Sequence, residues 1–177
     1  MRQEERRART RAALLRAAAI AFADRGYDGA SIDAIAASVG LSKGAVYAHF
    51  PSKLDLYLEV LNTLVEQAEW RLERVASAIR AGSNALEASR VYLGLGGDAQ
   101  HAALLSELWR AAAIEPEVRK VVERLVELRL GTLSRAAIDQ GMSPGAALDF
   151  AESTARFIDA GMLYRRIDDT AEEPAGS

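Results

Sequence analysis

The chain has 177 residues, half of them apolar, and it carries a formal net charge of −3 with no cysteine. This length and composition predict one domain or two small ones with a buried apolar core. The lack of cysteine excludes disulfides, thiol redox sensing and cysteine metal ligands, and with only two histidines we expect no metal site and no cofactor.

No apolar run approaches the roughly 18 residues that a membrane span needs, and the first residues lack the apolar stretch of a secretory signal. We therefore expect a soluble, cytoplasmic protein with no membrane partner. The charge is unevenly distributed, because residues 1–53 hold nine Lys and Arg against five Asp and Glu, whereas the remainder holds thirteen against twenty. A basic first third fits a protein that meets phosphate groups at one end, although solvated surface charge alone gives the same count.

Apolar periodicity predicts a first helix over residues 3–25, and two shorter helices follow within residues 31–53. In the first short helix, apolar residues recur at i, i+3, i+4 and i+7, and Ser31 stands at the N-cap position. Gly40 ends that helix, because glycine readily takes the left-handed conformation, and Ser42 caps the next helix, which runs to about residue 49. Two short helices joined in this way are typical of a helix-turn-helix reader of DNA.

A long helix comes next, with Ser52 and Asp55 as its capping pair and its end near Gly82. It has about 29 residues and spans about 43 Å, enough to link two bodies. Asn84 and Glu87 form a second capping pair, which opens the following helix. Further helices are predicted over residues 85–95, 99–113, 116–140 and 144–167.

No segment alternates apolar and polar residues as a strand does, so we predict an all-α chain. Residues 1–51 are assigned to a three-helix DNA-binding domain and residues 52–167 to a helical domain for ligand binding and dimerisation. Residues 168–177 are rich in acids with proline and glycine, and we expect this tail to be disordered.

A set of residues in the first third of the chain matches a pattern found in a known protein family. The set comprises Phe22, Gly26, Tyr27, Ser31, Ile32, Ile35, Ala36, Gly40, Leu41, Ser42, Gly44, Tyr47, His49, Phe50, Lys53 and Leu56. In order and spacing it is similar to the DNA-binding domain of the tetracycline-repressor (TetR) family of bacterial transcriptional regulators. The resemblance implies a homodimer that binds a palindromic double-stranded operator, represses transcription by default, and is released by a small-molecule effector.

The second short helix offers the side chains for reading DNA. Lys43 is long enough to reach guanine O6/N7 or a phosphate, Ala45 and Val46 can meet a thymine methyl, and Gly44 lets the backbone approach. The other donors suit phosphate oxygens; the alternatives are a packing aromatic for Tyr47 and an exposed or capping histidine for His49. The predicted DNA-binding residues are Ser31, Ser42, Lys43, Gly44, Ala45, Val46, Tyr47, His49 and Lys53.

The remaining helices carry weaker signals. The resemblance assigns the last two helices to a four-helix dimer bundle, although their apolar stripes fit burial within one subunit as well. The candidate dimer residues are Leu125, Leu128, Leu148, Ala151, Ala155, Ile158 and Met162. The resemblance also implies a ligand cavity among the middle helices, with Gln67, Trp70, Tyr92, His101 and Trp109 as candidate lining residues, although side chains of these types are more often core or ordinary surface.

The chain shows no nucleophile elbow, glycine-rich phosphate loop or metal-spaced histidine pair, so we predict that it is not an enzyme. The alternative function is a helical adaptor whose basic end binds an acidic protein partner and no DNA. Salt-sensitive, sequence-preferring binding to duplex DNA separates the two.

Overall fold

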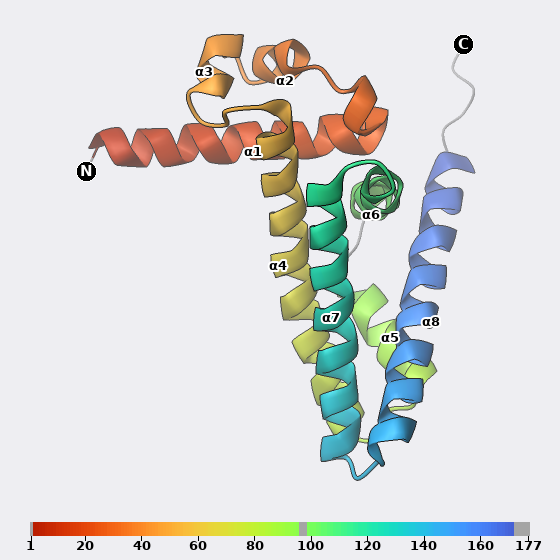
Figure 1. Cartoon of the computed structure of the whole chain (residues 1–177). Helices are drawn as coiled ribbons and strands as arrows, with labels where there is room; N and C mark the ends of the chain where they lie inside the picture. The colour runs from red at the N-terminus through yellow and green to blue at the C-terminus, as the bar shows by residue number, and fades with distance from the viewer. Residues whose placement is uncertain (1, 96–98, 172–177) are drawn as a thin grey trace. The chain divides into compact units, whose positions relative to one another are not determined.

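The computed structural model describes residues 2–95 and 99–171, and all regular secondary structure in these two ranges is helical (Figure 1). The prediction of an all-α chain is therefore confirmed. Over the same ranges, no helix combines the length and the apolar character that crossing a membrane requires. The helices are α1 (Arg2–Gly29), α2 (Ile32–Ser38), α3 (Lys43–Tyr47), α4 (Lys53–Arg80), α5 (Ala85–Gly94), α6 (Ala99–Ala112), α7 (Pro116–Asp139) and α8 (Pro144–Ala171).

The capping pairs predicted from the sequence start two of these helices. Asn84 Oδ1 accepts a hydrogen bond from the Glu87 amide at 3.0 Å, and the Glu87 carboxylate accepts one from the Asn84 amide at 3.0 Å. At the start of α4, Ser52 Oγ accepts a hydrogen bond from the Asp55 amide at 3.0 Å. These bonds satisfy amides that have no partner inside the helix, which fixes where each helix begins.

The end of α8 differs from the prediction. The helix continues to Ala171, so residues 168–171 are helical and their assignment to a disordered tail is wrong. The rest of the predicted tail, residues 172–177, lies outside the described residues.

Helix α1 is interrupted at Gly26, which has a φ of 70° and a ψ of 173°. This left-handed φ favours glycine, and the interruption agrees with the predicted helix end at residue 25. Next to it, the amide of Tyr27 donates a hydrogen bond to the Glu107 carboxylate at 2.6 Å. The interruption at Gly26 therefore places the end of α1 where Glu107 of α6 can accept its hydrogen bond.

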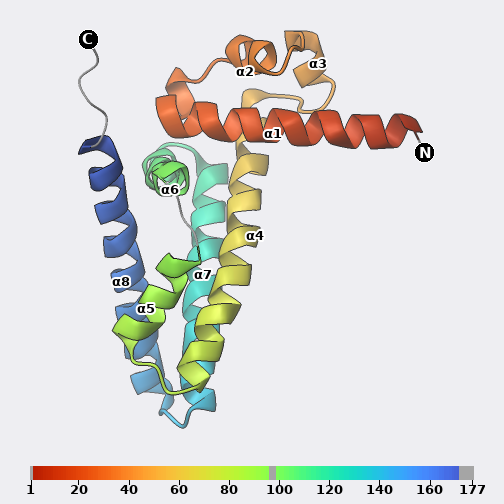
Figure 2. The same ribbon diagram turned by 180° about the vertical axis from the view of Figure 1, so that it is seen from behind.

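The chain forms two compact units, and both include parts of α4, α6 and α7. The first unit comprises residues 1–64 and 103–121, and in it α2 and α3 lie along the same side of α1 (Figures 1 and 2). Phe22 and Tyr57 are fully buried in this unit, with their ring centroids 4.8 Å apart in an edge-on arrangement. Aromatic pairs in this geometry add to the stability that burial alone gives.

The second unit comprises residues 65–102 and 122–177, and α5 packs against α8 within it (Figure 2). At the closest point, the Leu93 side chain leaves no room for a Cβ at Gly161. Arg129, which is buried, joins α7 to α8 by donating to the Ala155 carbonyl at 2.9 Å and pairing with Asp159 at 3.0 Å.

Candidate nucleic-acid interface and effector region

The turn between α2 and α3 is built as the sequence predicts. Gly40 has a φ of 69°, a value that an L side chain rarely adopts, and the amide of Leu41 donates back to the Ala36 carbonyl at 2.9 Å. Ser42 then caps α3, because its Oγ accepts a hydrogen bond from the Ala45 amide at 3.3 Å. The two helices are therefore fixed by hydrogen bonds within the turn itself.

Helices α2 and α3 each bury one face in the core of the domain. Ile35 and Val46 are each 1% exposed, and Phe50, just after α3, is 2% exposed. Val46 is thus a core residue, so its predicted contact with a thymine methyl does not fit the structure and we leave it out of the proposed DNA contacts. Helix α3 is only five residues long, which is why one of its buried positions was mistaken for a reading position.

The opposite face of α3 is open. Ser42, Lys43 and Gly44 are exposed, and Tyr47 is 42% exposed. A Cβ added at Gly44 would meet only Ser42 Oγ, at 3.9 Å, which is an ordinary contact distance. The remaining predicted DNA contacts near this face are the half-buried Ala45 and His49 and the exposed Ser31, whose side chain makes no capping bond to α2.

Lys43 is paired in the free protein. Its Nζ donates a hydrogen bond to the Asp33 carboxylate at 2.9 Å, and both side chains are largely exposed. This hydrogen bond and the charge of Asp33 raise the pKa of Lys43. Exposed ion pairs are weak, so a phosphate or a base edge can replace the carboxylate. Asp33 was missed by the sequence analysis, because the partners lie ten residues apart on different helices.

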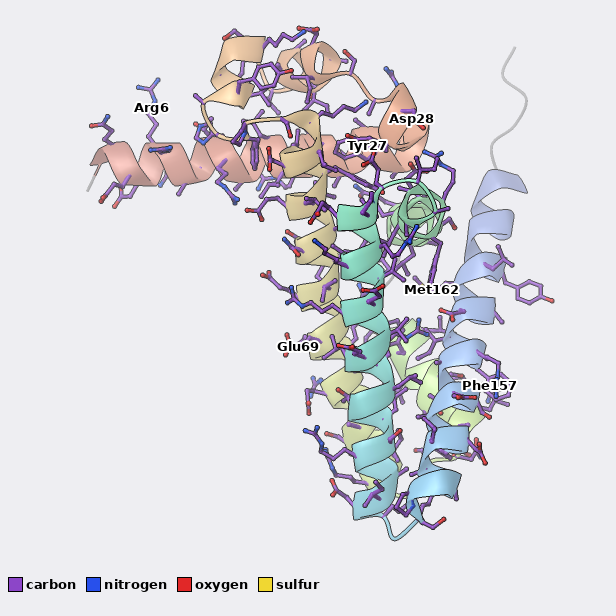
Figure 3. The ribbon with its side chains drawn as sticks, in the orientation of Figure 1. Arg6, Tyr27, Asp28, Glu69, Phe157 and Met162 are labelled. Carbon is purple, nitrogen blue, oxygen red and sulfur yellow. The ribbon has the colours of Figure 1, made fainter. Side chains whose placement is uncertain are left out.

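Lys53 occupies the first position of α4 and is half-buried. Its Nζ lies 4.8 Å from the centroid of the Tyr27 ring and donates a hydrogen bond to the Asp28 carbonyl at 3.3 Å. The ammonium group is therefore positioned at a helix start, beside amides that also favour an anion. Figure 3 labels Tyr27 and Asp28 at the end of α1.

The predicted effector-lining residues divide into two sets. Tyr92 and His101 are 3% and 6% exposed, and both contact Arg71, which the sequence analysis did not single out. The other three are exposed and do not join this cluster; they are Gln67, Trp70 and Trp109.

The predicted dimer residues are also divided by burial. Four are buried within the subunit, namely Leu125, Ala151, Ile158 and Met162, whereas Leu128 and Ala155 are half-buried and Leu148 is 45% exposed. Among residues 144–164 of α8, the exposed large apolar side chains are Leu148, Phe157, Leu163 and Tyr164. Figure 3 shows Phe157 pointing outward from α8 and Met162 on its inner side.

Comparison with known proteins agrees with this geometry. Residues 14–60 match the family described as bacterial regulatory proteins of the tetR family. Residues 14–60 therefore form a DNA-binding domain of the TetR family. TetR-family proteins are non-enzymatic, DNA-binding transcription factors, which confirms the predicted class and leaves the adaptor alternative without support. All of the predicted DNA contacts lie inside the matched segment.

Two curated relatives and one solved structure show how much of the chain is similar to known proteins. It is 52% identical over 56 residues to the transcriptional activator FasR of Mycolicibacterium smegmatis, covering 32% of this chain but only 26% of FasR. It is 26% identical over 155 residues to the transcriptional regulator CymR of Pseudomonas putida, covering 85% of this chain and 74% of CymR.

The structural neighbour shares the fold. It is a transcriptional regulator from Saccharomonospora viridis, solved in complex with choline, and it superposes with a TM-score of 0.70 at 23% identity. The alignment covers 96% of this chain and 90% of the neighbour.

Proposed function

We propose that this TetR-family regulator is a homodimeric repressor that binds a palindromic operator through α3 and is released by a small molecule. The observation that carries the proposal is the open face of α3, where Ser42, Lys43 and Tyr47 surround Gly44, a position without a side chain. An α-helix presented in this way fits the major groove, in which every base pair shows a distinct pattern of donors and acceptors.

The DNA contacts divide by chemistry. Lys43 and Ala45 are proposed to read base edges, and Gly44 allows the backbone to come close. Hydroxyl, imidazole and ammonium groups donate to phosphate oxygens and thereby set the register of the protein on the duplex. The proposed phosphate contacts are Ser31, Ser42, Tyr47, His49 and Lys53.

Dimerisation follows from the need to read two half-sites. A helix-turn-helix dimer places its readers one duplex turn apart, about 34–36 Å, which matches a palindromic operator. The support in this chain is the exposed apolar face of α8, which includes Phe157 and Tyr164. We therefore propose that α7 and α8 of two subunits form a four-helix bundle through exposed rather than buried residues.

The effector is proposed to act from the second unit, where α4 and α6 carry the buried cluster of Arg71 and His101. Helix α4 is continuous from Lys53, a proposed phosphate contact, to Arg80. Such a ligand changes operator affinity only by binding one state of the protein more tightly than the other. A difference of about 1–3 kcal/mol is typical of allosteric coupling.

Fluorescence anisotropy on the DNA upstream of the protein's own gene tests the proposal, with a scrambled duplex and a salt series as controls. We expect nanomolar, sequence-preferring binding that weakens steeply with salt. Equal and weak binding to both duplexes would contradict autoregulation and require a genome-wide search for the operator. Reporter expression with and without the protein then distinguishes repression from activation.

Substitution of Lys43 and Lys53 distinguishes contacts with bases from contacts with phosphates. Lys53→Ala should weaken binding to every duplex and lower the salt slope by about one, because one phosphate contact is lost. Lys43→Ala should instead change the order of preference among operator variants. Binding curves on cognate and scrambled duplexes measure both effects. Equal losses on the two duplexes for Lys43→Ala would remove Lys43 from base readout.

A further inference from the structure

The second unit contains a guanidinium group that pairs with no carboxylate of residues 2–95 and 99–171. Arg71 on α4 is 9% exposed and lies on the same helical face as Ala68 and Val75, which are 1% and 0% exposed. Arginine is seldom buried so deeply unless it is paired with an anion. Yet across the described ranges Arg71 takes part in no ion pair. An anion that is not part of the chain would supply the missing charge.

Arg71 contacts two side chains, and neither is a carboxylate. Its Nη1 lies 2.8 Å from His101 Nε2, and its guanidinium carbon lies 5.8 Å from the centroid of the Tyr92 ring. Because arginine can only donate, His101 Nε2 must accept, which requires a neutral imidazole protonated on Nδ1. The contact with the Tyr92 ring is a cation–π interaction, which offsets only part of the cost of burying the charge.

Other polar atoms of this cluster are not completely enclosed by the protein. Neither the remaining guanidinium nitrogens of Arg71 nor the Tyr92 hydroxyl has a hydrogen bond within the described part of the chain. Among the described residues, the side-chain polar atoms that are both fully buried and without a hydrogen bond are Tyr57 Oη and Ser134 Oγ, so the atoms of Arg71 and Tyr92 are not fully buried. These donors therefore contact accessible space, although their residues are almost entirely buried. Leaving buried donors unpaired is costly, so that space should hold water or a ligand.

We propose that Arg71, Tyr92 and His101 form the anion-binding end of the effector site, and that the effector is a small organic carboxylate with an apolar body. The free edge of a guanidinium matches a carboxylate with two parallel hydrogen bonds, and the Tyr92 hydroxyl can donate a third. His101 holds the guanidinium from the other side. The surrounding helical faces are apolar, with Ala68, Val75 and Ala102 buried, and they suit the rest of such a molecule.

This inference rests on the proposed function, because it names the ligand class of the effector-responsive regulator. It also separates the protein from its choline-bound neighbour. A quaternary ammonium ion would be repelled by the Arg71 guanidinium, so we expect choline not to bind at this cluster.

The test uses the full-length protein with octanoate and phenylacetate as probes. Their neutral amides and choline chloride serve as controls, at constant ionic strength. We expect at least one carboxylate to raise the thermal unfolding midpoint in a saturable way, while the amides and choline leave it unchanged. In Arg71→Met, the dissociation constant for that carboxylate should rise at least about tenfold, because a charge-assisted hydrogen bond is lost. The dissociation constant of Arg71→Lys should lie between those of the wild type and Arg71→Met, since lysine keeps the charge but cannot donate two parallel hydrogen bonds.

Arg74→Met is the matched control. Arg74 lies one turn further along α4 and is exposed over the Trp70 ring, with its guanidinium carbon 5.5 Å from the ring centroid. Carboxylate binding should be unchanged in this variant. The proposal is overturned if neither carboxylate stabilises the protein more than its amide. It is equally overturned if the stabilisation persists in a folded Arg71→Met or Arg71→Lys protein with no loss of affinity.

Operator binding separates this inference from the proposed function. Carboxylate binding that depends on Arg71 but leaves anisotropy on the operator unchanged would uphold the anion site and contradict effector release. Release of the operator by choline or by the amides, with no carboxylate bound, would uphold an effector-responsive regulator and overturn the anion site.

Discussion

At the scale of single residues, Gly44 is a position where the fold does not need a glycine. It lies in α3 with helical backbone, and an added Cβ would meet only an ordinary contact with Ser42 Oγ at 3.9 Å. Alanine is a better helix former than glycine by about 1 kcal/mol. A glycine that the fold does not require fits a place where DNA approaches the backbone.

Gly44→Ala should therefore separate stability from binding. We expect the free energy of unfolding to stay unchanged or to rise by up to about 1 kcal/mol, while operator affinity falls, because the methyl group holds the helix away from the groove. Urea unfolding and anisotropy measure the two quantities. Gly145→Ala, at a similarly open position of α8, should leave affinity unchanged. Undiminished operator affinity in Gly44→Ala would show that DNA does not approach at this residue.

Tyr57 presents the opposite case, a polar group that the fold buries without a partner. Its hydroxyl has no hydrogen bond within the described structure, while its ring packs 4.8 Å from Phe22 and 4.9 Å from Tyr27 between centroids. Removing the hydroxyl keeps the ring packing and relieves an unsatisfied buried donor. Tyr57→Phe should thus raise the free energy of unfolding by about 1 kcal/mol, with Tyr164→Phe as an exposed control.

The same substitution should change the pH dependence of stability. Burial raises the pKa of Tyr57 above its ordinary value of 10.0, so the unfolded phenol ionises first as pH rises. The free energy of unfolding is therefore unaffected by this ionisation below pH 10, and it falls as the pH rises above 10 because the unfolded chain loses the Tyr57 proton more readily. Denaturant unfolding between pH 9 and pH 11 should show a smaller loss for Tyr57→Phe than for the wild type. A loss of stability on removing the hydroxyl at pH 7 would mean that the group is hydrogen-bonded in solution.

At the scale of elements, α6 is tied to the end of α1 by one carboxylate. Glu107 accepts hydrogen bonds from the Tyr27 amide at 2.6 Å and from Arg110 Nε at 2.8 Å, and it is 9% exposed. Arg110 also reaches the Asp28 carboxylate at 3.1 Å, and both partners together raise its pKa. A buried carboxylate bonded to a backbone amide is a stronger connection than the exposed ion pair beside it.

Glu107→Gln should lower the free energy of unfolding by about 1–3 kcal/mol, because it weakens a charge-assisted hydrogen bond and leaves buried groups poorly paired. Asp28→Asn, which removes only the exposed partner, should change it by less than about 0.5 kcal/mol. Urea titration of both variants and the wild type gives the comparison. Equal losses in the two variants would show that the ion pair, and not the amide contact, holds the helices together.

The helices themselves were largely predictable, because the signals that start and stop them are local. Asn84 with Glu87, and Ser42 with the α3 amides, satisfy helix ends within three residues of sequence. Gly26 and Gly40 mark the breaks because their backbone needs a left-handed φ. The end of α8 was predicted too early, since an acidic composition weakens a helix without stopping it.

The site was less predictable, because its pairings are not local. Tyr92 and His101 were candidates for the cavity that the family resemblance implies, but nothing in the spacing indicated that Arg71, thirty residues before His101, would contact both of them. In the same way, Lys43 was predicted to contact DNA, whereas its ion-pair partner Asp33 was not recognised. Val46 shows the converse error, because in a very short helix periodicity cannot separate the buried face from the reading face.

At the scale of the whole molecule, the proposed recognition of a palindromic operator requires a second copy of the chain. A single helix-turn-helix reads only one half-site, and linking two readers multiplies their affinities through a high effective concentration. On α8, Phe157, Ala160 and Tyr164 lie at i, i+3 and i+7 and are all exposed. This spacing forms one stripe on the helix surface, wide enough to pack against its copy.

Phe157→Glu places a charge at one end of that stripe and should prevent dimerisation, because the carboxylate would be buried against its own copy without a partner. Sedimentation at micromolar concentration should then show a monomer. Anisotropy should show operator affinity reduced at least about 100-fold, since the second half-site no longer contributes, whereas binding to an isolated half-site should be unchanged. Ile114→Glu, at a residue that is 67% exposed in the first unit, tests whether a new surface charge alone has this effect, and it should remain a dimer. If Phe157→Glu sediments as a dimer and binds the full operator normally, the subunits associate through another face. The buried residues of α7 and α8 would then serve only packing within the subunit.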